Sequence, residues 1–435
     1  MRLARRLLLA ALVGHAGAAA QTLGPPDPRS APATEQATPR PPAVGPALYE
    51  AVQRATDSYP AVQSQRGSVR AADQEIRAAK QLALPRFGVQ GVALGTGDGL
   101  GSQLVADQPV YTFGRIGAQV DRARAERMAR AGQVDETVLR LALDVTDAYF
   151  TIARLARRAS ILEANLKNLD TLVGSIRNRV DAEVSPATDL ALARSRASQT
   201  QQELALTRAQ QQAAVARIRQ FLGDASYDPG AVPTYDPAIH HPQIADAIEA
   251  ARRCSPARGR LAAQAMVAQA DARIARKSLL PQLSAQASYN DIVGARVGLA
   301  VTAQTQGGLS DLRRADAARE RASAAGIDVQ TAERETIEQV SADLVENAAA
   351  RDRIDASKDA ADTADQVTAS FYRQFVAGRR TWLDVMNAVR EAAQARLGES
   401  DAEITAMASS ARLLLRTCTW QPQGRLLGEP AWPSD

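Results

Sequence analysis

The stretch VDETVLRLALDVTDAYFTIARLARRASILEANLKNLDTLVGSIRNRV, residues 134–180, carries one unbroken apolar pattern. Its apolar residues recur in alternating steps of four and three, the heptad spacing of a helix that pairs along its length in a left-handed coiled coil. These seam positions are Val134, Val138, Leu141, Val145, Ala148, Ile152, Leu155, Ala159, Leu162, Leu166, Leu169, Val173, Ile176 and Val180. The pattern predicts a helix over about 114–181, on the order of 100 Å long.

The chain also contains an internal duplication. Three pairs of segments match at a spacing of about 195 residues, which is far longer than the unit of a solenoid repeat. The pairs are 78–90 with 274–286, 113–126 with 307–320, and 188–193 with 383–388. We therefore expect two copies of one large unit, with a second long helix over about 308–377.

Each unit also carries two short segments typical of strands. They follow the steps Leu84-Pro85 and Leu280-Pro281, where proline ends the preceding helix. Their apolar residues alternate, and the glycine-rich GTGDGLG at 95–101 is typical of a hairpin loop. The expected strands are 86–94, 103–111, 282–291 and 295–304.

The two ends of the chain have compositions of their own. Residues 1–20 combine a basic start, a short apolar run and small residues before Gln21, the pattern of a secretory signal peptide. Residues 21–46 are rich in proline, and we expect a disordered leader. The remaining chain is divided into a first repeat at 47–243, a second repeat at 244–420 and a C-terminal tail at 421–435.

Charge and motifs exclude several function classes. The 52 basic and 48 acidic residues are interspersed, which is typical of solvated helix faces and not of a nucleic-acid-binding patch. His240 and His241 lack the further ligands that a metal site needs. Because no phosphate-binding loop, nucleophile elbow or catalytic triad is found, we expect neither an enzyme nor a cofactor.

The strands and the long helices together predict a membrane protein of unusual form. A four-stranded sheet has open edges, and a sheet in a bilayer must close into a barrel so that every backbone group is paired. Strands of nine or ten residues can cross a bilayer. Several chains that pool four strands each would meet both demands, with the long helices continuing as a hollow tube.

On these features the sequence resembles the TolC-type outer-membrane efflux proteins of Gram-negative bacteria over about 48–420. The resemblance rests on the two Leu-Pro steps, QPVYTFGR at 108–115, the duplication, and the segments EVSPATDLALARSR and FVAGRRTWLDVMNA. It implies a mixed, mainly α fold in which a homotrimer forms a 12-stranded barrel in outer-membrane lipid and a periplasmic helical tunnel. It also implies docking of a periplasmic adaptor and an inner-membrane transporter of the RND or ABC class.

The resemblance assigns FVAGRRTWLDVMNA, residues 375–388, to the periplasmic tip of the tunnel, where the closed entrance is held by polar links. Arg380 matches the bridging arginine of the family, and Thr188 and Asp189 match its partners. Asp384 matches an aspartate that rings the aperture. Three such carboxylates around a narrow pore would attract cations.

Two tip positions depart from the family pattern. Phe375 stands where a relative has a tyrosine, so a hydroxyl link is expected to be missing. Asn387 stands where that relative has a second aspartate. The negative charge of the ring is therefore expected to be smaller in this chain. The alternative is that these polar residues are ordinary solvated residues of a turn between helices.

Cys254 and Cys418 are the two cysteines of the chain. An exported protein permits a disulfide between them, and they could meet if both lie in the belt around the middle of the tunnel. Two free thiols are the alternative.

Three function classes stay open at this point. The first is an outer-membrane exit duct for small molecules. The second is the same architecture in type I secretion of a polypeptide. The third is a periplasmic coiled-coil scaffold without a barrel, which leaves the four strand-like segments unexplained.

Overall fold

The computed structural model describes residues 39–93, 100–242, 246–290, 294–303 and 310–426. The expected signal peptide and most of the expected leader lie outside the described residues. Ordered structure begins within the predicted leader 21–46, because Val44 is fully buried in the core and Pro46 starts the first helix described.

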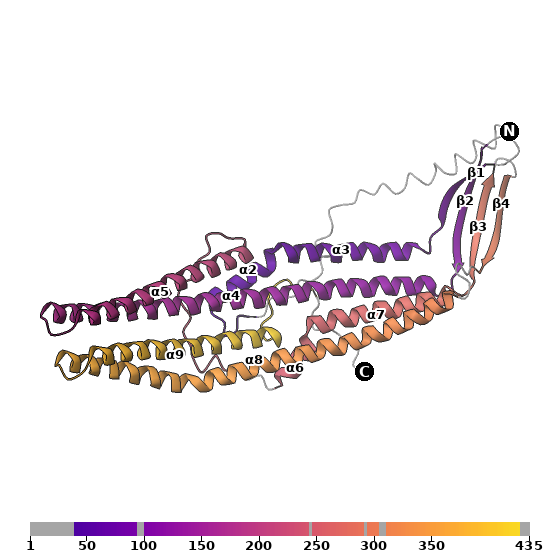
Figure 1. Cartoon of the computed structure of the whole chain (residues 1–435). Coiled ribbons are helices and arrows are strands. Elements are labelled where there is room, and N and C mark those ends of the chain that lie inside the picture. Colours follow the sequence, from indigo (N-terminus) through magenta and orange to yellow (C-terminus); the bar gives the residue numbers. More distant parts are fainter. Residues whose placement is uncertain (1–38, 94–99, 243–245, 291–293, 304–309, 427–435) are drawn as a thin grey trace. The chain divides into compact units, whose positions relative to one another are not determined.

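Two helical hairpins dominate the structure (Figure 1). Their helices are α4 (Arg115–Asp181) with α5 (Ala187–Leu222), and α8 (Ser310–Val376) with α9 (Trp382–Arg416). Both long helices have 67 residues, close to the predicted ranges. Most seam positions of α4 are buried and the others are half-buried, which confirms the long packed helix that the heptads predict.

Four shorter helices pack along this pair. They are α2 (Pro46–Ser58), α3 (Pro60–Gln81), α6 (Ala247–Cys254) and α7 (Pro256–Lys277). α7 lies against both α4 and α8. At Gly132 of α4 an added Cβ would come within 2.9 Å of the Cα of Arg260, so the close approach of α4 and α7 requires glycine there.

The four strands form one antiparallel sheet in the order β1-β2-β3-β4. They are β1 (Arg86–Ala93), β2 (Leu100–Tyr111), β3 (Gln282–Asn290) and β4 (Gly294–Thr302). β2 starts three residues before the predicted 103–111, so its first residues belong to the stretch predicted as a hairpin loop. Residues 95–99 of that stretch, and residue 94 at the end of the first predicted strand, lie outside the described part.

The register of the sheet separates an apolar face from a polar face. Val89 lies opposite Leu104, and Leu104 lies opposite Tyr289. The large apolar side chains of this face are exposed, and Val297 reaches 85%. They are Phe87, Val89, Leu104, Tyr289, Val297, Leu299 and Val301. Because the chain alone leaves this face uncovered, it needs an apolar environment.

The other face of the sheet is polar. Arg86 lies opposite Asp107, which lies opposite Gln286. The amide of Gln286 donates to the Asp107 carboxylate at 3.0 Å. Apolar and polar residues thus alternate along the strands as they do in a membrane barrel, with the apolar face toward lipid.

The largest apolar core lies where α2, the middle of α4 and the end of α9 meet, around Val52, Val138, Met407 and Trp420. Part of the predicted C-terminal tail also packs here, since the backbone amide of Leu426 donates to the Asp135 carboxylate at 2.7 Å.

Among the helices that the structure describes, none is both long and apolar enough to span a bilayer.

Candidate functional site

The turns at the ends of α4 and α8 have the same backbone geometry. The amide of Val184 donates to the Arg179 carbonyl at 2.8 Å, and the amide of Arg379 donates to the Gln374 carbonyl at 2.8 Å. Each turn holds one residue in the left-handed region, Glu183 (φ 58°) and Gly378 (φ 73°). These are helix C-caps of the Schellman type at matching places in the two proposed repeats.

An apolar cluster joins the two hairpins just behind these turns. Leu172 and Ile176 of α4 are almost fully buried with Phe375 of α8 and Val385 of α9. Trp382 packs against the same cluster. The tip is therefore a packed unit of both hairpins rather than two separate turns. We call residues 169–193 and 371–389 that contribute to this cluster the tip cluster.

Two further contacts cross between the hairpins at the tip cluster. The Arg179 guanidinium lies over the Phe375 ring, 5.1 Å from its centre. The hydroxyl groups of Ser175 and Tyr372 lie 3.3 Å apart. Phe375, where the family resemblance implies a lost hydroxyl link, is 3% exposed and forms an apolar and cation–π link instead.

Arg380 makes its contacts within the second hairpin. Its guanidinium lies 4.1 Å from the centre of the Phe371 ring, 3.4 Å from the Gln374 amide oxygen and 3.9 Å from the Asp384 carboxylate. Among the described residues, no hydrogen bond or ion pair joins Arg380 to Thr188 or Asp189. Within one chain the structure thus does not bring the predicted bridging arginine to its predicted partners.

Asp384 has a structural role at the start of α9. Its carboxylate accepts from the backbone amide of Thr381 at 3.3 Å and from the Thr381 hydroxyl at 2.8 Å. The amide of Asp384 donates back to the Thr381 hydroxyl at 3.2 Å. This capping box satisfies amide groups that the helix leaves without partners. The side chain is still 40% exposed, so its charge reaches solvent.

The other predicted site residues lie on the surface of the two hairpins. Thr188 and Asn387 are exposed, and Asp189 is half-buried in the first turn of α5. A carboxylate in the first turn is favourable because the helix N-terminus carries partial positive charge.

Arg179, Ser175, Phe371 and Tyr372 form contacts at the tip that the sequence reasoning did not select. The sequence does contain a signal for the aromatic residues Phe371 and Tyr372. Aromatics make up only 4% of the chain, yet Phe371, Tyr372 and Phe375 fall within five residues of each other just before the turn. Nothing in the sequence marks Arg179 among the many arginines on the helix surfaces.

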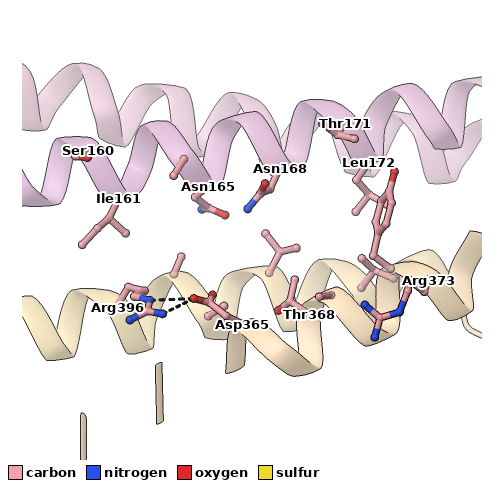
Figure 2. A pocket seen from close by; sticks show the side chains of 17 residues that line it. Ser160, Ile161, Asn165, Asn168, Thr171, Leu172, Asp365, Thr368, Arg373 and Arg396 are labelled. Carbon is pink, nitrogen blue, oxygen red and sulfur yellow. Dashed lines mark hydrogen bonds and ion pairs between the residues drawn. The ribbon is translucent and has the colours of Figure 1, made fainter. Parts of the chain in front are cut away.

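A cavity of about 720 Å³ lies between α4 and the second hairpin, a few turns from the tip (Figure 2). Asn165, Thr171 and Leu172 line it from α4. On the opposite wall, Arg396 forms an ion pair with Asp365 at 2.6 Å (Figure 2). Arg396 also forms an ion pair with Asp362 at 2.8 Å. Hydrogen bonds to Glu399, Asp365 and Asp362 raise the pKa of Arg396.

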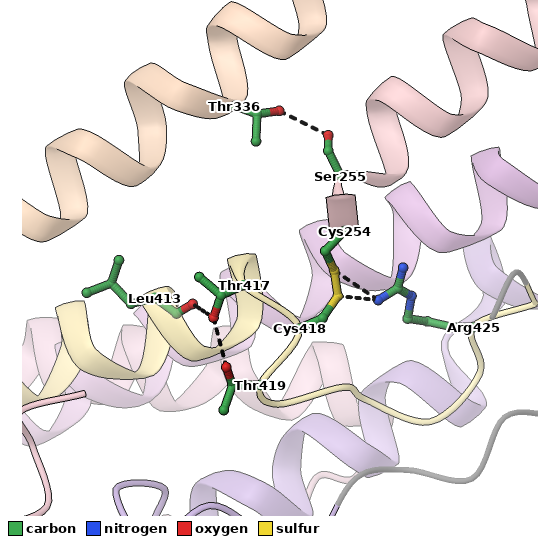
Figure 3. Close-up of a disulfide and its surroundings, with 8 residues drawn as sticks. All are labelled: Cys254, Ser255, Thr336, Leu413, Thr417, Cys418, Thr419 and Arg425. Atoms are coloured by element: carbon green, nitrogen blue, oxygen red, sulfur yellow. Dashed lines mark hydrogen bonds between the residues drawn. A yellow bond between two sulfur atoms is a disulfide. The ribbon is translucent and has the colours of Figure 1, made fainter. Parts of the chain in front are cut away.

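Cys254 and Cys418 form a disulfide in the structure, with their Cα atoms 6.0 Å apart (Figure 3). It joins the last residue of α6 to the segment that follows α9. The guanidinium of Arg425 donates to the Cys418 sulfur at 2.7 Å. The bond thus ties the start of the second predicted repeat to its end.

His240 has a packing role in the structure. It is 5% exposed and its ring stacks on Tyr235, with the centres 5.5 Å apart. Burial lowers the pKa of His240. In the part of the chain that the structure describes, no group of three or more metal-ligating side chains occurs.

Comparisons with known proteins identify a family and several solved structures that this chain resembles. Residues 51–224 match the model of the family described as outer membrane efflux protein. No curated protein sequence matches the chain significantly.

Solved structures match nearly the whole chain at low sequence identity. The outer-membrane channel OprN is 17% identical with a TM-score of 0.77, over 91% of this chain and 98% of its own. VceC from Vibrio cholerae is 16% identical with a TM-score of 0.74, over 85% and 95%. The open-state channel MtrE of Neisseria gonorrhoeae is 15% identical with a TM-score of 0.72, over 91% and 96%.

The four-stranded sheet and the long helical hairpins give the chain the fold of TolC-like outer-membrane channel proteins. The match to the outer membrane efflux protein family covers residues 51–224, which lie in the first predicted repeat. The resemblance and the fold class expected from the sequence are thereby confirmed.

Proposed function

We propose that this efflux channel is a homotrimer and the exit duct of a tripartite system for small molecules. A periplasmic adaptor and an inner-membrane transporter of the RND or ABC class would deliver substrates to it. The observation that carries the proposal is the sheet with one exposed apolar face, attached to two helices of 67 residues. Such helices are on the order of 100 Å long, enough to reach far into the periplasm.

The sheet supports the trimer. β1 and β4 lie at its two edges, and an exposed edge exposes unpaired backbone groups. Three copies would pair each β1 with the β4 of a neighbour and close a 12-stranded barrel. The exposed residues Phe87, Val297 and Leu299 would then face lipid, and the polar face would line the channel.

The tip cluster supports a gate at the periplasmic end. We propose that Arg179 with Phe375 holds the two hairpins of one protomer together. Arg380 is then available to approach Thr188 and Asp189 of a neighbouring protomer, since it is exposed on its own hairpin. Asp384 and Asn387 would ring the entrance, where one carboxylate per protomer favours cations.

A deletion strain of the host tests the proposed function. We expect loss of the chain to raise the intracellular accumulation of a fluorescent efflux dye such as ethidium. Plasmid-borne wild type restores efflux, whereas Leu299→Lys, which places a charge on the lipid face, does not. Gln286→Lys on the polar face is the matched control and should restore it.

The same strain separates the alternatives. Unchanged dye accumulation together with loss of a polypeptide from the culture medium would assign the chain to type I secretion. A chain that is extracted from the periplasm without detergent would be a scaffold, and both channel functions would be excluded.

A further inference from the structure

A second concave site lies at the junction of the sheet and the long helices. This cavity of about 420 Å³ is formed where β1 and β3 begin and where α4 and α8 start. Arg86, Arg115 and Arg314 line it together with Asp311 and Gln282. We call these five residues the junction site. It lies at the opposite end of α4 from the tip cluster.

The charge of the junction site is positive. Three guanidinium groups face one carboxylate, and that carboxylate of Asp311 is engaged by Arg314 at 2.7 Å. Arg115 is held in place by a short hydrogen bond to the amide oxygen of Gln282. A fourth cation stands close by, because Lys277 donates to the carbonyl of Gly114 at 3.2 Å.

Helix geometry adds to this positive charge. The N-termini of α4 and α8 both meet the junction site, since Arg115 and Ser310 are their first residues. In the described residues no side chain caps α4, and its first turn holds no acidic residue. A helix N-terminus attracts anions through its partial positive charge and its unpaired amide groups.

The junction site lies on the polar side of the sheet. Arg86 shares the face of Asp107 and Gln286, and Gln282 lies opposite Thr302 on the same face. In a trimer with its apolar face toward lipid, this side lines the channel. Three copies would place nine arginines around the channel where the barrel meets the tunnel.

We propose that the junction site binds anions that pass through the channel, such as the carboxylate or phosphate groups of a substrate. Planar guanidinium groups bind both groups through paired hydrogen bonds. Rings of arginine also favour anions over cations in pores. The proposal rests on the trimeric channel proposed above, and it adds an anion-selective region to a pore whose tip carries aspartate.

Pyrophosphate as a blocker of single channels tests the site. Detergent-purified protein is inserted into planar bilayers of phosphatidylcholine, and pyrophosphate is added on the extracellular side, which reaches the junction without crossing the tip. We expect block of the wild type. In the double variant Arg86→Gln, Arg314→Gln the concentration for half-block should rise about tenfold or more, because charge-assisted hydrogen bonds are lost.

Arg313→Gln is the matched control. Arg313 precedes Arg314, is 88% exposed and pairs with Asp316 outside the junction site. It should leave the block unchanged. Equal block of the double variant and the wild type would overturn the proposal. Block that disappears when phosphatidylglycerol is added to the bilayer would assign the site to a lipid headgroup and overturn it as well.

A separate result marks failure of the proposed function. If purified wild type forms no channels in any bilayer, the trimeric channel itself is contradicted, and the junction site loses its place in a pore. Channels that form with normal conductance but without pyrophosphate block contradict only the anion site.

Discussion

The guanidinium of Arg179 lies 5.1 Å from the centre of the Phe375 ring and joins the first helical hairpin to the second at the tip. Phe375 is almost fully buried at this contact, whereas Arg380 stays exposed on its own hairpin. Within the chain, the hairpins are thus joined at the tip by this cation–π contact and by the hydroxyl groups of Ser175 and Tyr372. We propose that the polar link of Arg380, which the family resemblance implies, forms between protomers.

Removing the aromatic link should loosen the tip. Phe375→Ala deletes a buried ring and leaves a cavity, at a cost of about 3 kcal/mol or more. We expect the single-channel conductance of the purified trimer in planar bilayers to increase. Arg179→Ala should act in the same direction but more weakly, because a partly exposed cation–π contact contributes about 1 kcal/mol.

Arg177→Ala is the control for this pair, since Arg177 is exposed on the same turn of α4. Its conductance should equal that of the wild type. Wild-type conductance in Phe375→Ala would rule out the aromatic link as part of the gate.

The charge and the capping role of Asp384 can be separated. Asp384→Asn keeps a side-chain oxygen for the Thr381 amide but removes the charge. We expect a lower cation preference, measured as the reversal potential in a salt gradient, with the melting temperature nearly unchanged. Thr381→Ala removes the cap acceptor, and should cost about 1 kcal/mol of stability while the cation preference stays. An unchanged cation preference in Asp384→Asn would show that Asp384 caps α9 but does not determine the ion selectivity of the channel.

The disulfide should stabilise the second half of the chain. The double variant Cys254→Ser, Cys418→Ser removes the disulfide, which joins two residues 164 positions apart in the sequence. Loss of a disulfide typically lowers the free energy of unfolding by about 2–5 kcal/mol. Thermal unfolding followed by circular dichroism should show a lower midpoint for the double variant. The wild type should migrate faster on non-reducing than on reducing gels, and equal migration would mean that the thiols are free.

A buried ionic cluster between α8 and α9 provides a further test. Asp343 is 8% exposed and binds both Arg412 and Arg416 at 2.8 Å. Asp343→Ala leaves two partly buried cations without this partner, which should cost about 3 kcal/mol. Asp316→Ala breaks an exposed ion pair and should cost less than about 1 kcal/mol. Equal midpoints in thermal unfolding would show that the Asp343 cluster adds no stability.

The helices and strands could be predicted because their signals are periodic. Val134 to Val180 repeat the heptad spacing, and the strands alternate between apolar and polar residues, so burial on one face determines each element. The start of β2 at Leu100 was missed because glycine-rich sequence is typical of loops as well as of strand ends. The burial of Val44 among prolines was also missed, because it depends on contacts with distant parts of the chain.

The candidate site was harder to predict than the fold. The duplication located the tip, since 188–193 matches 383–388, but side-chain contacts depend on rotation of each helix about its axis. Arg380 and Arg179 have the same chemistry in the sequence. The two arginines differ in the ring that each contacts. Arg380 contacts Phe371 of its own hairpin, whereas Arg179 contacts Phe375 of the other hairpin.

The proposed trimeric channel is tested most directly by the behaviour of the purified protein in a planar lipid bilayer. We expect a detergent-dependent trimer that gives uniform conductance steps, and a Leu299→Lys variant that inserts poorly while Gln286→Lys inserts normally. Charge on the lipid face of a barrel costs about 2–4 kcal/mol near the middle of the membrane, whereas charge on the channel face does not. A detergent-free monomer without conductance, or equal insertion of both variants, would contradict it.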